Sequence, residues 1–77
     1  MHRVYFDTNE GADHGYGLWL NASIEDLSRI PEGPQEGMRV IIYMTGELEM
    51  QATLKFAREQ NCWIALPIPG TTTYLAD

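Results

Sequence analysis

The stretch Glu47–Phe56 reads E-L-E-M-Q-A-T-L-K-F, and its pattern decides the fold. Polar and apolar side chains alternate through all ten positions. On a strand successive side chains point to opposite faces, so the apolar ones share one face, whereas a helix would scatter them around its circumference. The stretch therefore predicts a long strand with one dry and one wet face.

Two further β-prone runs flank this strand. Residues 38–44 read M-R-V-I-I-Y-M, and Gly46 in the following turn can adopt the positive φ of a tight hairpin. Residues 62–66 read C-W-I-A-L and end at Pro67, which cannot donate to a sheet ladder. Three consecutive antiparallel strands are therefore expected over residues 38–66.

The N-terminal and C-terminal segments predict shorter strands. Residues 3–6 and 16–20 alternate, and the acid-rich segment 7–15 that joins them is expected to be an exposed loop. Residues 71–75 are β-prone and predict an edge strand.

One short helix is expected between the second and third strands. Ser23 is placed to cap it, and Glu25 and Asp26 follow in the first turn, where carboxylates suit the helix dipole. About two turns are not stable alone, so the helix is expected to pack on the sheet. Its apolar residues recur at every third position before Pro31 ends the run: Ile24, Leu27 and Ile30.

The predicted fold is mostly β, in the order β-β-α-β-β-β, as a single domain over residues 1–77. In element order alone it resembles a compact antiparallel barrel of the SH3-like type. An open antiparallel sheet with the helix on one face is the alternative. The residues expected to form the core are Val4, Phe6, Leu18, Leu20, Val40, Ile42, Met44, Leu48, Met50, Ala52, Leu54, Phe56, Ile64 and Leu66.

The charge balance disfavours several partners. Eleven acidic and five basic residues give a net charge of −6, and the bases never form a run. Nucleic acids and anionic membranes are bound by clustered Lys and Arg, so neither is expected. The first residues lack the apolar stretch of a secretory signal, and no run approaches the roughly 20 residues of a membrane helix, so a cytoplasmic protein is expected.

No motif for catalysis or metal binding is complete. The single cysteine, Cys62, cannot form an intramolecular disulfide and disfavours a zinc site. The loop that starts at Asp7 departs from the EF-hand pattern at its fifth, sixth and twelfth positions. Cys62 shares the phase of Ile64, which disfavours a nucleophile–base pair with His14, and His2 would reach His14 only if the first two strands paired. No enzymatic activity, cofactor, metal ion or small-molecule ligand is expected.

Aromatic residues on the nominally outer face are the strongest functional feature. Tryptophan and tyrosine often anchor protein interfaces, so they predict a protein partner or self-association. Two alternatives are that the helix covers these side chains or that strong curvature folds them into the core. The candidate interaction residues are Tyr5, Trp19, Ile41, Tyr43 and Trp63.

Two other functions were weighed against a non-enzymatic interaction domain. One is an acidic decoy that binds a nucleic-acid-binding protein through carboxylates, although mimicry of DNA calls for denser charge. The other is a small metal-dependent or hydrolytic enzyme that uses Asp7, Asp13 and His14, with His2 as a further candidate. The residues that motivate the decoy are Asp7, Glu10, Asp13, Glu47 and Glu49.

Overall fold

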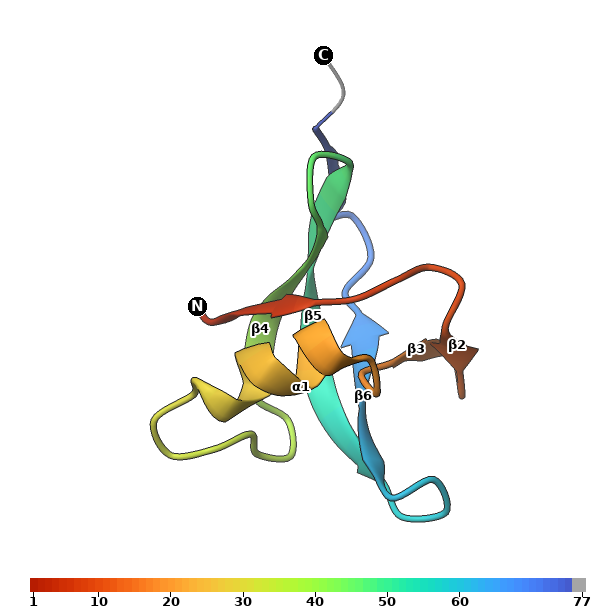
Figure 1. Ribbon diagram of the computed structural model, residues 1–77. Coiled ribbons are helices and arrows are strands. Elements are labelled where there is room, and N and C mark those ends of the chain that lie inside the picture. The colour runs from red at the N-terminus through yellow and green to blue at the C-terminus, as the bar shows by residue number, and fades with distance from the viewer. Residues whose placement is uncertain (76–77) are drawn as a thin grey trace.

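The computed structural model describes residues 1–75, which form seven strands and one short helix (Figure 1). The elements, in chain order, are β1 (Arg3–Tyr5), β2 (Gly11–Ala12), β3 (Gly15–Gly17), α1 (Asn21–Ser28), β4 (Arg39–Met44), β5 (Leu48–Ala57), β6 (Cys62–Pro67) and β7 (Thr73–Tyr74). Among these residues no helix is long and apolar enough to cross a membrane.

The strands form one sheet in the order β1-β4-β5-β6-β3-β2, and β7 pairs with the beginning of β5. The predicted meander is confirmed, because β4, β5 and β6 pair antiparallel in succession. The predicted closed barrel is wrong: β1 and β2 lie at opposite ends of the strand order, so the sheet is open. It also departs from the fully antiparallel alternative, because β1 runs parallel to β4.

The segment between the first two predicted strands contains a hairpin of its own. Gly11 and Ala12 pair with Tyr16 and Gly15, although residues 7–15 were expected to be a loop. Asp13 and His14 form the two-residue turn with φ of 42° and 70°, which is the left-handed backbone that tight hairpins favour. The predicted strand 16–20 ends early, at Gly17.

The helix starts three residues before the position that its capping pattern predicted. It begins at Asn21, Leu20 occupies the N-cap without a side-chain hydrogen bond, and Glu25 and Asp26 lie beyond the first turn. Ser23 is fully buried instead and donates its hydroxyl to the Tyr5 carbonyl at 2.6 Å. The predicted cap is therefore wrong because Ser23 has a partner in a distant strand.

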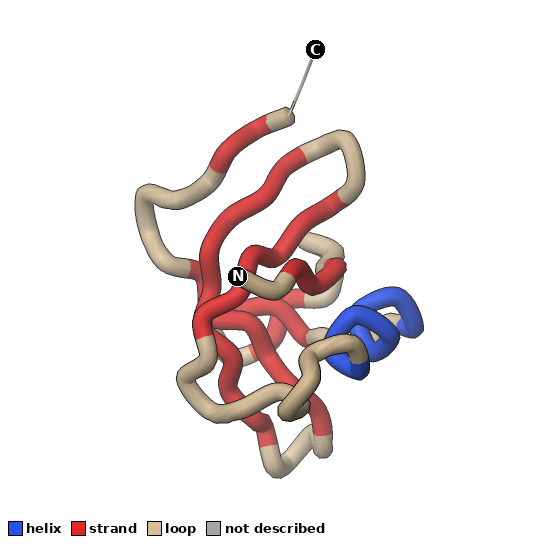
Figure 2. The backbone as a smooth tube through the Cα atoms, turned by 90° about the vertical axis from the view of Figure 1, so that its left-hand side faces the viewer, coloured by secondary structure: helices blue, strands red, loops and turns tan. Residues whose placement is uncertain are grey.

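Two side chains of α1 complete the hydrogen bonding of the edge strand β1. On one side of β1, Phe6 N–H donates to the Tyr43 carbonyl of β4. On the other side, Tyr5 N–H donates to Asp26 Oδ2 at 2.9 Å, and the Tyr5 carbonyl accepts from Ser23. The helix lies beside β1 and to one side of the strands, where another strand would otherwise continue the sheet (Figures 1 and 2).

Side chains also finish the ladder of β5 where neighbouring strands end. Phe56 N–H donates to Glu36 Oε1 at 2.7 Å, and Gln51 N–H donates to Thr71 Oγ1 at 3.0 Å. These contacts satisfy backbone donors that would otherwise need water.

The hydrophobic core lies on one face of β1, β4 and β5, with α1 packed over it. The predicted buried face of β5 is confirmed at the centre of the strand. Leu27 and Ile30 of the helix segment pack into the same core. The buried cluster comprises Val4, Phe6, Leu18, Leu27, Ile30, Val40, Ile42, Met50, Ala52, Leu54 and Ala65.

The predicted phase of β6 is wrong. Phe56 pairs with Trp63 and Leu54 with Ala65, and directly paired residues point to the same face, so Trp63 and Ala65 face the core. Ile64 is also buried, but outside the core cluster. The adjacent residues Ile64 and Ala65 point to opposite faces of β6 and are both buried, so alternation cannot distinguish the two faces.

Replacement of Asp26 by Ala should destabilise the fold by about 1–3 kcal/mol, because it leaves the Tyr5 N–H without its partner. The matched control is Glu25→Ala, which removes a solvent-exposed ion pair with Arg29 and should change stability by no more than about 0.5 kcal/mol. Urea unfolding of the two variants measures the difference. Equal midpoints would show that the contact between α1 and β1 contributes nothing.

Candidate functional site

The five predicted interaction residues do not form one surface. Tyr5 and Tyr43 pack against each other on β1 and β4. Ile41 lines a separate hollow of about 140 Å³ with side chains of β5 and the 71–73 segment. Trp19 and Trp63 line a larger groove beside α1. The five residues therefore lie at three separate locations.

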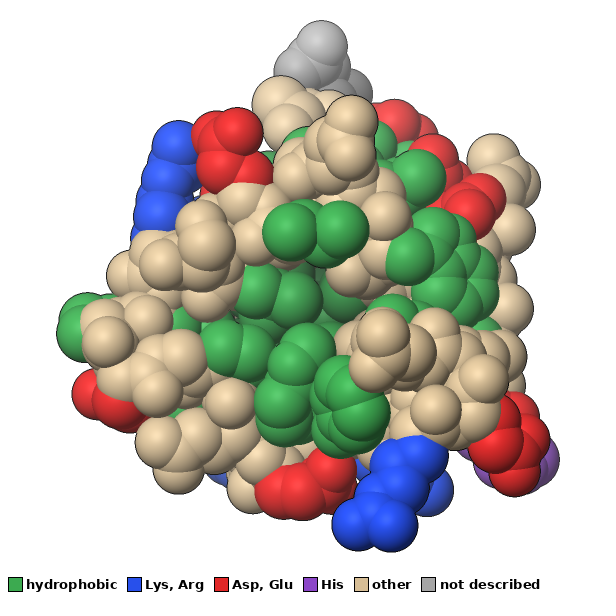
Figure 3. Space-filling model, turned by 60° about the horizontal axis from the view of Figure 1, so that its bottom comes forward, with side chains coloured by type: hydrophobic (Ala, Val, Ile, Leu, Met, Phe, Trp, Pro, Cys, Tyr) green, Lys and Arg blue, Asp and Glu red, His purple; other side chains and the backbone are tan. Residues whose placement is uncertain are grey.

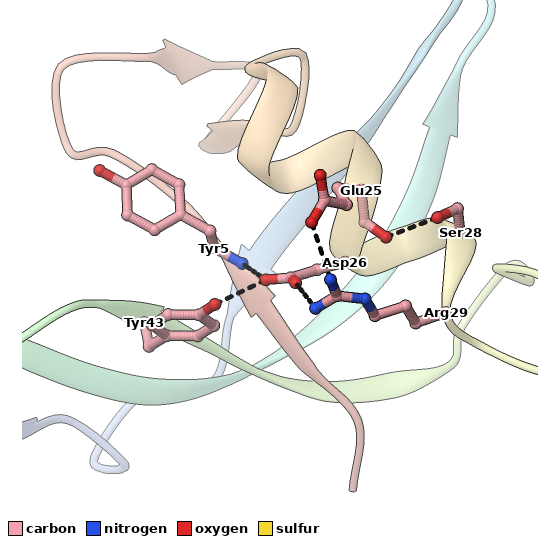
Figure 4. Close-up of polar contacts among 6 residues, drawn as sticks. All are labelled: Tyr5, Glu25, Asp26, Ser28, Arg29 and Tyr43. Carbon is pink, nitrogen blue, oxygen red and sulfur yellow. Dashed lines mark hydrogen bonds and ion pairs between the residues drawn. The ribbon is translucent and has the colours of Figure 1, made fainter.

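Tyr5 and Tyr43 are engaged within the molecule. Their ring centroids are 5.8 Å apart with an interplanar angle of 79°, which is an edge-to-face pair. The Tyr43 hydroxyl donates to Asp26 Oδ2 at 2.7 Å, whereas the Tyr5 ring points away and only its backbone N–H reaches this carboxylate (Figure 4). Arg29 Nη1 lies 3.4 Å from the other oxygen of Asp26. The pair therefore joins α1, β1 and β4.

Arg3 covers the same aromatic pair from the outer face of β1. Its guanidinium carbon lies 4.8 Å from the centroid of the Tyr43 ring, and its Nη1 lies 2.9 Å from Glu49 Oε2. This stacking is a cation–π contact. Tyr43 is thus held by contacts on both its hydroxyl and its ring.

The Tyr43 hydroxyl ionises above its ordinary range. The hydrogen bond that it donates to Asp26 is the main cause of its raised pKa, and burial adds to the effect. A phenol whose folded-state pKa is raised contributes stability below its unfolded value of about 10 and loses it as the pH rises through the folded value.

We therefore expect wild-type stability to fall more steeply than that of Tyr43→Phe above about pH 10. Ultraviolet titration of phenolate should show that the step with the highest pKa is missing in Tyr43→Phe, while Tyr74→Phe, at an exposed tyrosine, keeps it. Asp26→Asn should lower the pKa of Tyr43. If Tyr43→Phe and wild type lost stability in parallel, the hydrogen bond to Asp26 would not govern this titration.

An apolar groove of about 400 Å³ lies between α1 and the β5–β6 hairpin. In the view from below, hydrophobic side chains gather in a hollow at the centre of the face, with polar and charged groups at its border (Figure 3). Ile24 and Leu27 of α1 form one wall. Phe56 and Trp63 form the other, with ring centroids 5.2 Å apart.

Trp19 also lines the groove, and two contacts fix its side chain. The indole Nε1–H donates to Glu10 Oε1 at 2.6 Å. The six-membered ring lies so close to Gly17 that a Cβ atom at that position would overlap with it. The residue nevertheless remains 36% exposed. Trp19 is therefore a partly exposed aromatic side chain in a defined orientation.

The three-residue spacing in the sequence predicted the wrong environment for the groove residue Ile24. It was expected to face the sheet with Leu27 and Ile30, yet it is 52% exposed. Ile30 lies beyond the end of α1, and the buried residues of the helix are Ser23 and Leu27. At about 100° per residue, Ile24 lies about 100° from Ser23 and about 60° from Leu27 around the axis, so it points away from the core.

The groove thiol has little nucleophilic character. Cys62 lines the groove, and burial raises its pKa, so it stays protonated near neutral pH. Tyr16 pairs with Ala65, so the strand register places His14 roughly 16 Å along β6 from Cys62. His2 and His14 also lie near opposite ends of the strand order, because the first two strands do not pair. Within residues 1–75 no cluster of three His, Cys, Asp or Glu residues is placed to hold a metal ion.

Compared with known proteins, the chain matches no family model, no curated protein and no solved structure. The volume of the groove lies in the lower part of the range of about 300–1,000 Å³ that binding pockets span, and its walls offer apolar contact.

Gly17→Ala should displace the Trp19 ring and destabilise the protein by about 1–3 kcal/mol through overpacking. Gly11→Ala is the matched control in the same hairpin, since the nearest atom to its Cβ would be 4.0 Å away. Tryptophan fluorescence should change in the first variant alone, and thermal unfolding gives the stability. Identical spectra for both variants would mean that Gly17 does not position Trp19.

Proposed function

We propose that this chain is a non-enzymatic protein-interaction domain whose contact site is the groove between α1 and the β5–β6 hairpin. The observation that carries the proposal is the partial exposure of Trp19 and Ile24 in an otherwise apolar hollow. A large exposed apolar side chain on a helix contributes nothing to the core, whereas it gains from burial by a partner.

The shape of the groove suits side chains of a protein. A volume of about 400 Å³ accommodates one or two large apolar side chains, and aromatic walls give the contact area that interface anchors use. Gln60 and Asn61 at the hairpin tip add polar groups to the lining. An apolar centre with a polar border is the usual anatomy of a protein interface.

The fixed position of Trp19 supports the same function. Binding costs entropy when interface side chains must become ordered, and a side chain that is already held loses less. The contacts of Trp19 with Glu10 and Gly17 supply that order before any partner arrives.

The acidic decoy receives less support. Glu49 is paired with Arg3, and Glu10 accepts the indole N–H of Trp19. Asp7 Oδ1 accepts the N–H of Asn9 at 2.8 Å, so three of the five carboxylates that motivated this alternative have partners within the molecule. The contact between Glu10 and Trp19 instead serves the groove.

Selection from a library of random peptides displayed on phage tests the proposal. We expect enriched sequences that bind wild type and lose at least about tenfold in affinity on Ile24→Asp, because a carboxylate in an apolar groove must be desolvated. Ala22→Asp is the matched control: it adds the same charge to an exposed position of α1 that does not line the groove.

The two outcomes separate clearly. Peptides that bind wild type and Ala22→Asp but not Ile24→Asp support the proposal. Failure to enrich any sequence, or binders with equal affinity for both variants, would reject the groove as a protein contact site. Circular dichroism confirms that each variant is folded.

A further inference from the structure

We infer that the groove takes a segment of a partner protein in which apolar side chains are flanked by lysine or arginine. This inference rests on the proposed function and specifies its partner. It follows from the charges around the groove, because the lining residues themselves are neutral at pH 7.

Two carboxylates adjoin the groove. Glu10 accepts the indole N–H of Trp19, and Glu25, which is exposed, follows Ile24 on α1. Glu59 at the hairpin tip lines a different hollow with Lys55 and Arg58. The chain as a whole carries a net charge of −6, which adds a long-range field of the same sign.

The positive charge closest along α1 is already compensated. Arg29 lies 2.7 Å from Glu25 Oε1 and 3.4 Å from Asp26 Oδ1, so this trio retains one negative charge. Lys55 and Arg58 line the other hollow together with Asp13 and Glu59. Within residues 1–75, no lysine or arginine lines the groove to receive an acidic partner.

These charges also act against a second copy of the chain as the occupant. Two molecules of charge −6 repel each other, most strongly at low salt, where charges interact over longer distances. A basic segment binds more favourably for two reasons. The negative field attracts it during encounter, and its bases pair with the carboxylates once it is bound. Each exposed pair contributes only a few-fold in affinity, so several flanking bases are needed.

Three short peptides with the same tryptophan and leucine anchors test the inference. Their flanking positions carry lysine, glutamine or glutamate throughout. Binding is measured by fluorescence anisotropy at low and high salt, with wild type, Ile24→Asp and Ala22→Asp. Alkylation of Cys62 provides a second readout that is specific to the groove, because an occupant should shield the thiol.

The expected order of affinity is lysine, then glutamine, then glutamate, with a difference of about tenfold or more between the extremes. Salt should weaken the lysine peptide and not the glutamine peptide. The lysine peptide should also slow alkylation of Cys62 in wild type and Ala22→Asp but not in Ile24→Asp. Glu25→Lys should reduce the preference for lysine.

Other results overturn the inference in distinguishable ways. If the glutamine or glutamate peptide binds as tightly and still requires Ile24, the partner is not basic but the interaction site stands. If the lysine peptide binds Ile24→Asp and Ala22→Asp equally and leaves Cys62 unprotected, it binds by nonspecific electrostatic attraction. The groove is then not the binding site. If wild type associates with itself on sedimentation, and Ile24→Asp is a monomer, the occupant is a second copy.

Discussion

Tyr5 has one backbone N–H and one carbonyl that no strand satisfies, and α1 supplies a partner for each. Asp26 accepts from the N–H and Ser23 donates to the carbonyl, while the same carboxylate also accepts from Tyr43 on the neighbouring strand. Unpaired backbone groups at a covered edge would be costly, so these contacts fix where the helix can dock. The position of α1 in turn places Ile24 and Leu27 opposite the β5–β6 hairpin, and the groove follows from that placement.

The groove combines features that come from different parts of the chain. Its helix wall depends on the docking of α1, its hairpin wall on the register that pairs Phe56 with Trp63, and its third side on the contact between Trp19 and Gly17. None of these contacts uses a charged lining residue, so charge acts only from the border. In the proposed interaction, this separation would let apolar anchors set the location of binding while carboxylates select the partner.

The sequence predicted the elements whose two faces differ. In β5 one face meets the core and the other meets solvent, so alternation revealed both the strand and its buried side. In β6 both faces are covered, and the same reasoning placed Trp63 on the wrong one. The start of α1 was missed because Ser23 resembles a cap, while its partner lies 18 residues away. Two of the five candidate residues reached the groove, and Ile24 was missed because a three-residue spacing drifts around a helix.

Because the Asp26 carboxylate joins α1 to two strands, loss of its contacts would favour aggregation of the protein. If the helix detached, β1 would present an unsatisfied edge that can pair with the edge of another chain, the usual first step of fibrillar aggregation. The same detachment would dismantle the groove, since Ile24 and Leu27 leave with the helix. If the proposed partner binds the groove, it would stabilise the docked helix by mass action and so protect the protein from this aggregation.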